Sequence, residues 1–271
     1  MSFTSASPFA TPEISRRYFA VRRNRNRRKG HDHSSFFTNC PQLQAWESQS
    51  NSSQIAIYSG YDTRQAVRDF AVDAIELIMS AQIPVIWALK LPHTEFKFSE
   101  EDVLKYLVSQ ILRLNETLLN ERSAGLNAAR YQSATTLEEW FSLLGCVVEG
   151  LPQVFIIIDL GLLHSEVHAT IAWSQLFEQF FEELNKRCIR TTVKVAFLGT
   201  RTSHRGILRD LDHGRILQLP GRKRTGRVNK SYDPHRSKKL KSKRTGRMLG
   251  SSETLGKRLD CGREAEAGRK V

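Results

Sequence analysis

The sequence predicts an α/β fold, a three-layer parallel sheet of about five strands with helices on both faces. Short apolar segments alternate along the chain with longer amphipathic ones, a pattern typical of strands joined by helical crossovers. The most strand-like segment, Gln153–Asp159, is apolar on both faces, as a central parallel strand must be. Both ends of the chain lack such periodicity, so we expect one domain flanked by disordered basic tails.

The predicted elements follow from the spacing of apolar residues. Apolar residues recur at intervals of three and four in the expected helices, as Val67, Phe70, Ala71 and Ala74 do in the first. Ser99 followed by a carboxylate three residues later suits the start of the second. Helices are expected at 63–81, 99–120, 136–149 and 166–187. Strands are expected at 54–59, 84–89, 153–159, 191–198 and 215–219.

The formal net charge of +13 is distributed unevenly along the chain. Residues 1–35 hold eight Lys/Arg against two acids, and residues 221–271 hold seventeen against five. Residues 36–220 hold the remaining sixteen bases and twenty-one acids. We therefore divide the chain into a disordered basic segment, 1–35, an α/β domain, 36–220, and a disordered basic tail, 221–271. Because the basic charge belongs to the tails, we expect no basic docking face on the domain itself.

The cysteines and the apolar runs indicate the cellular compartment of the protein. Cys40, Cys146, Cys188 and Cys261 form no CxxC pair and are not grouped with histidines, which favours reduced, buried thiols. The apolar runs are far shorter than a membrane span, and the N-terminus lacks the apolar stretch of a secretory signal. We expect an intracellular protein of the nucleus or cytoplasm. A mitochondrial presequence in the first 30 residues, rich in Ser and Arg, is the alternative.

Two basic clusters in the C-terminal tail, separated by a spacer, have the form of a two-part nuclear-import signal. Such clusters also make weak, charge-driven contact with nucleic acid, although few aromatic residues accompany them to stack on bases. The residues concerned are Arg222, Lys223, Arg224, Lys238, Lys239, Lys241, Lys243 and Arg244.

The loop after the first strand begins at Gly60 and leads into the first helix. A phosphate loop, GxxxxGK[ST], needs a second glycine, a lysine and a hydroxyl residue at fixed places. When Gly60 is taken as the first glycine, those places hold Gln65, Ala66 and Val67. Arg64 and the helix N-terminus could still hold an anion. The alternative is an ordinary strand-to-helix turn.

Polar residues also follow the third and fourth strands. Asp159 comes after four apolar residues, the form of a Walker B strand whose carboxylate reaches the magnesium shell. Leu160 and Gly161 stand where hydrolytic versions carry a second acid. Thr200 and Arg201 end the fourth strand and could sense a γ-phosphate; a solvated loop is the alternative. No metal ligand is expected, except Asp159 if magnesium binds.

Residues 54–203 resemble the nucleoside-triphosphatase core of NACHT-like STAND proteins, particularly the divergent fungal set. The resemblance is carried by the segments Ile55–Phe70, Ile83–Leu89, Phe155–Asp159 and Phe197–Arg201. It implies a P-loop NTPase-like fold with a vestigial nucleotide site at Gly60, Arg64, Asp159, Thr200 and Arg201. The phosphate loop, the family's most specific motif, is absent from this sequence.

We therefore expect a degenerate NTPase domain that acts as a binding or signalling scaffold, with no catalytic residue, no hydrolysis and no cofactor. In such a site Asp159 should pair with Arg64 or Arg201, or cap the turn that follows it. One alternative is an active hydrolase that binds Mg-ATP or Mg-GTP and uses Arg64 in place of the lysine. Another is a nuclear protein that binds nucleic acid through its tails. The sequence identifies no protein partner.

Overall fold

The computed structural model describes residues 10–29, 37, 39–92, 97–115, 128–163, 168–200 and 216–219. The expected C-terminal tail, with its import-like clusters, lies outside these residues. No helix in the described ranges is long and apolar enough to cross a membrane.

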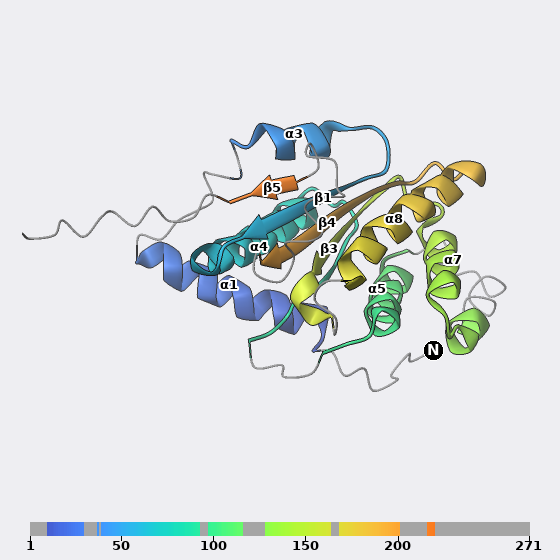
Figure 1. Ribbon diagram of the computed structural model, residues 1–271, viewed down its shortest axis with the longest axis horizontal. Coiled ribbons are helices and arrows are strands. Elements are labelled where there is room, and N and C mark those ends of the chain that lie inside the picture. Colours follow the sequence, from blue (N-terminus) through green and yellow to red (C-terminus); the bar gives the residue numbers. More distant parts are fainter. Residues whose placement is uncertain are drawn as a thin grey trace, which may run out of the picture. The chain divides into compact units, whose positions relative to one another are not determined.

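Five parallel strands form one sheet, in the order β2-β3-β4-β1-β5 (Figure 1). Ser59 pairs with Thr200, and Asp159 pairs with Leu198, so β1, β3 and β4 end close together along one edge of the sheet. The strands are β1 (Ser53–Ser59), β2 (Val85–Ala88), β3 (Gln153–Asp159), β4 (Thr192–Thr200) and β5 (Ile216–Gln218). All five predicted strands are present, and the predicted α/β class is confirmed.

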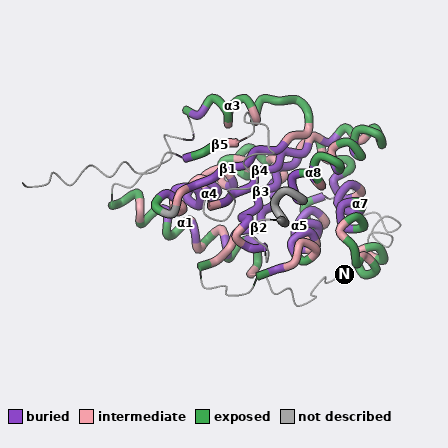
Figure 2. Tube along the Cα trace, viewed as in Figure 1, coloured by how far each residue is buried: buried purple, intermediate pink, exposed green. Residues whose placement is uncertain are grey.

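Helices cover both faces of the sheet (Figures 1 and 2). Neighbouring residues of each strand point to opposite faces, so each strand contributes apolar side chains to two cores. Ile156 belongs to the core beneath α5, α7 and α8, whereas Ile157 belongs to the core beneath α1, α3 and α4. The four helices predicted from the sequence are present, as α4 (Arg64–Ser80), α5 (Glu100–Leu114), α7 (Leu137–Val148) and α8 (His168–Lys186).

Capping residues set the limits of two of these helices. Ser99 with Asp102, and Thr136 with Glu139, form reciprocal capping boxes at the starts of α5 and α7. α5 ends at Leu114, six residues before the predicted boundary at 120. It ends there because Asn115 leaves the helical conformation and its side-chain amide donates to the carbonyls of Val147, at 2.8 Å, and Glu149, at 3.0 Å.

The expectation that residues 1–35 are disordered is wrong for Pro12–Arg28, which form helix α1. Thr11 caps the helix through a hydrogen bond from the Ile14 N–H, and proline occupies its first position. Trp87 Nε1 donates to the Pro12 carbonyl at 3.0 Å, which ties the start of α1 to β2. The domain boundary predicted at residue 36 is therefore too late.

Charge complementarity holds α1 alongside α4 (Figure 1). Arg23, whose side chain is 7% exposed, lies 2.8 Å from Asp73 and 2.7 Å from Glu76. Arg27 lies 2.7 Å from Asp73, and the Asn26 amide donates to Asp69. Some of the basic side chains of residues 1–35 thus form ion pairs with acidic side chains of the α/β domain. The division of charge along the sequence did not predict this pairing.

The short helix α3 (Pro41–Ser48) was not predicted, and a buried lysine holds the loop that follows it. Lys194, near the start of β4, is fully buried. Its Nζ lies within 2.6–3.0 Å of the carbonyls of Trp46, Gln49 and Asn51 and 3.0 Å from Ser53 Oγ. Burial lowers the pKa of Lys194, whereas the surrounding oxygens stabilise the charged ammonium.

The three described cysteines are free thiols. Cys40 is buried, as expected, but Cys146 is half-buried and Cys188 is exposed. Cys188 adopts a positive φ of 54° in the turn after α8, which places it outside the core.

Candidate functional site

The loops at the carboxyl ends of β1, β3 and β4 form the candidate site, as expected for an open α/β sheet. Gly60 follows β1, Asp159 ends β3 and Thr200 ends β4. β4 lies between the other two strands. The fold therefore gathers these three predicted residues at one edge. Arg201 lies outside the described residues.

The Gly60 loop has the geometry of a strand-to-helix turn. The Thr63 N–H donates to the Gly60 carbonyl at 3.1 Å, closing the single 3-10 turn Tyr61–Thr63, and α4 begins at Arg64. A Cβ added at Gly60 would meet only Thr63 Oγ1, at 3.8 Å, which is ordinary contact. The backbone conformation and surroundings of Gly60 therefore do not require glycine, as the close backbone approach of a phosphate loop would.

Protein groups occupy the carboxylate of Asp159, which is 8% exposed. Its Oδ1 accepts from the Gly161 N–H at 2.9 Å and so caps the turn Leu160–Leu162, one of the arrangements expected for a degenerate site. Its Oδ2 accepts from the Lys90 N–H at 3.3 Å and lies 3.7 Å from Arg68 Nη2. The cation is Arg68, one helical turn beyond the expected Arg64.

Lys90 is a residue of the site that the sequence analysis missed. It follows β2, and its Nζ donates to the Gly161 carbonyl at 2.8 Å. A Cβ at Gly161 would lie 2.9 Å from Asp159 Oδ1, too close for any other residue without a shift. Lys90 and Asp159 thus hold the turn closely around Gly161, so a side chain at position 161 would require Asp159 to shift. A charged residue directly after the strand predicted at 84–89 was the signal that could have identified Lys90.

Positive charge outnumbers negative charge around Asp159. Burial lowers the pKa of Arg68; Asp159 acts to raise it, and Arg64 and Arg22 act to lower it further. Burial likewise lowers the pKa of Lys90, which Asp159 acts to raise. The guanidinium of Arg68 also lies 5.5 Å from the ring centroid of Phe19. The site therefore contains one carboxylate with two hydrogen bonds and an ion pair among several cations, an arrangement that disfavours a divalent cation.

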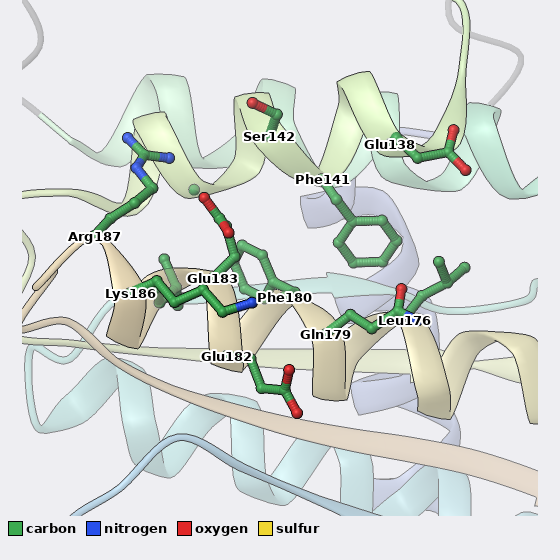
Figure 3. Close-up of a pocket in the computed structure, with 12 residues that line it drawn as sticks. Glu138, Phe141, Ser142, Leu176, Gln179, Phe180, Glu182, Glu183, Lys186 and Arg187 are labelled. Carbon is green, nitrogen blue, oxygen red and sulfur yellow. The ribbon is translucent and has the colours of Figure 1, made fainter.

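Two grooves lie away from this edge. One, of about 440 Å³, lies between α3 and α4 and includes Phe70 and Trp46. The other, of about 320 Å³, lies between α7 and α8, where Phe141 faces Phe180 and Leu176 (Figure 3). Charged side chains, including Glu182 and Arg187, surround its apolar floor. The described residues contain no cluster of three or more His, Cys, Asp or Glu that could hold a metal ion.

No family model and no curated protein matches the chain. Among solved structures, the Aeropyrum pernix ORC2 protein aligns in its ADPNP–ADP complexes with 11% identity and a TM-score of 0.37, over 81% of this chain and 50% of that one. The ADP form of the same protein aligns with 10% identity and a TM-score of 0.36, over 81% of this chain and 51% of that one. Drosophila ORC bound to GC-rich DNA and Cdc6 aligns with 10% identity and a TM-score of 0.31, over 82% and 35%.

This chain spans about half the length of the two ORC2 chains. The fold class stands on the parallel sheet and its two covering layers of helices. The chain therefore contains a three-layer parallel α/β domain with the candidate site at the carboxyl edge of its sheet.

Proposed function

We propose that this domain is a degenerate P-loop NTPase-like module, related to the NACHT-like STAND cores, that acts as a binding or signalling scaffold without hydrolysing nucleotide. The engagement of Asp159 by Gly161, Lys90 and Arg68 carries this proposal. A magnesium ion needs carboxylate oxygens in near-octahedral geometry at about 2.1 Å. To reach Asp159 it would displace these partners and approach two cations, Arg68 and Lys90.

The first turn of α4 supports the same function. In the phosphate-loop register, Ala66 and Val67 stand at the positions of the lysine and the hydroxyl residue. Their side chains are 1% and 3% exposed and belong to the core between α4 and the sheet. Gln65, at the place of the second glycine, donates to Asp69 along the helix. A side chain at position 66 or 67 therefore points into the core and away from a phosphate.

Replacing Asp159 with asparagine tests the proposal. We expect wild type to show no rise in melting temperature with Mg-ATP. We expect the variant to lose about 1–2 kcal/mol of stability, because Arg68 and the Gly161 N–H lose a charged partner. The measurement is thermal unfolding of both proteins, with and without Mg-ATP.

The matched control is Asp102→Asn, which removes a capping carboxylate that accepts from Ser99 at the start of α5 and not from the turn after β3. It should show no dependence on nucleotide. A nucleotide-dependent rise in the melting temperature of wild type that disappears in Asp159→Asn would contradict the scaffold function, because only a ligand that binds the native state stabilises it in this way.

A further inference from the structure

The basic residues of helix α1 lie on two different faces of the helix. Arg16, Arg23 and Arg27 face the acidic side chains of α4. Five other basic side chains are exposed, and within the described ranges none of them makes a hydrogen bond or an ion pair. We call these five the outer basic face: Arg17, Arg22, Arg25, Arg28 and Lys29.

The outer basic face covers one side of the helix. At 100° per residue, its five positions fall within about 140° of the helix circumference, from Arg17 to Arg22, and Arg22 borders the buried residue Ser15. Exposed and buried positions alternate along α1 in Figure 2. Arg17 and Arg28 are eleven residues apart, which corresponds to about 17 Å along the helix axis.

The positive charge of this face extends towards the edge of the sheet. Arg22 lies close enough to Arg68 for its charge to act on the pKa of Arg68, and so does Arg64. Asp159 is the carboxylate that contacts Arg68, and it is already engaged. Glu13 lies one helical turn before Arg17, but within the described ranges no acid forms an ion pair with any of the five cations, in contrast to the inner arginines.

We propose that the outer basic face binds the phosphate backbone of double-stranded nucleic acid without reading its sequence. Four of its five cations are arginines, whose planar guanidinium groups match phosphate with two parallel hydrogen bonds. Duplex DNA carries one phosphate per ~1.7 Å of axis, so a 17 Å face spans roughly ten phosphates of the two strands. This activity is separate from the scaffold function and does not depend on the state of the Asp159 site.

The other features of α1 favour a duplex over a membrane. A helix that lies in a membrane surface inserts an apolar face, but the apolar face of α1, centred on Phe19, is buried in the domain. Ile14 and Val21 are exposed on the same side of α1, two turns apart, but they are only two apolar side chains and stand among charged ones.

The aromatic residues of α1 favour a duplex over a single strand. Binding of single strands relies on exposed aromatic rings that stack on bases. Phe19 is buried, and Tyr18 is half-buried with its ring against the edge of Phe19, at 5.2 Å between centroids. α1 therefore offers cations without a stacking platform.

The test compares two full-length double variants with wild type. Arg25→Gln with Arg28→Gln removes two charges from the outer basic face and keeps good helix formers. Lys186→Gln with Arg190→Gln, the matched control, removes two exposed charges near the end of α8, on the opposite face of the sheet. Binding to a mixed-sequence duplex is measured by fluorescence anisotropy between about 50 and 200 mM salt.

We expect the outer-face variant to bind the duplex at least about tenfold more weakly than wild type. The slope of log K against log salt concentration should decrease in magnitude by about 1.8, because two phosphate contacts are lost. The control should change affinity less than about threefold, because long-range charge effects are screened. A loss no larger than that of the control would overturn the proposal. Tighter binding to phosphatidylserine-containing vesicles or to the single strand than to the duplex would overturn it too.

Discussion

Replacing Phe19 with alanine is expected to lower the free energy of unfolding by about 3–5 kcal/mol, the usual cost of truncating a buried phenylalanine. Phe19 is 1% exposed and is the large apolar side chain that α1 buries in the core beneath α4. Its ring also lies beneath the guanidinium of Arg68. The substitution would leave a cavity at the junction of α1, α4 and the sheet.

Equilibrium unfolding in denaturant measures this effect, with Val21→Ala as the matched control. Val21 lies on the same helix but is 58% exposed, so its truncation should change stability by no more than about 0.5 kcal/mol. If Phe19→Ala cost less than about 1 kcal/mol, α1 would not be an integral part of the domain.

Replacing Lys194 with methionine is expected to cost about 2–4 kcal/mol. Methionine fills the volume of the lysine stem but donates no hydrogen bond, so the oxygens of Trp46, Gln49, Asn51 and Ser53 lose their shared partner. An unsatisfied buried acceptor costs about 1–3 kcal/mol. Water can reach part of this exposed loop, which limits the sum. The loop 49–52 should also become more sensitive to proteolysis.

The control for Lys194→Met is Lys186→Met, at an exposed position of α8, which should be neutral within about 0.5 kcal/mol. Burying an ammonium costs desolvation energy, which opposes the gain from these hydrogen bonds. If Lys194→Met were as stable as wild type or more stable, desolvation would outweigh the four hydrogen bonds, and the role assigned to Lys194 would be wrong.

The sequence predicted the sheet well because the core strands consist of continuous apolar residues, as in Gln153–Asp159. It failed for α1, whose buried face combines Phe19 with Ser15 and Arg23 and so has no apolar period. Arg23 is buried only because Asp73 and Glu76 meet it from α4. A sum of charges by segment cannot reveal such pairing.

The candidate site was predictable in part. Strand ends placed Gly60 and Asp159 at one edge of the sheet, where β4 lies between their strands, and the same rule applied to β2 would have found Lys90. Arg68 had no such signal, because its position depends on the packing of α4 against Phe19 of the unpredicted helix α1. Whether Gly60, Arg64, Asp159, Thr200 and Arg201 ever contact a nucleotide stays a prediction.

Titration of the full-length protein with a fluorescent ATP analogue in magnesium tests the central claim most directly. Because Asp159 is held by Gly161, Lys90 and Arg68, and because positions 66 and 67 face the core, we predict no saturable binding in the micromolar range. Micromolar affinity that requires magnesium, and that Asp159→Asn abolishes, would contradict the account and identify the domain as a working nucleotide-binding module.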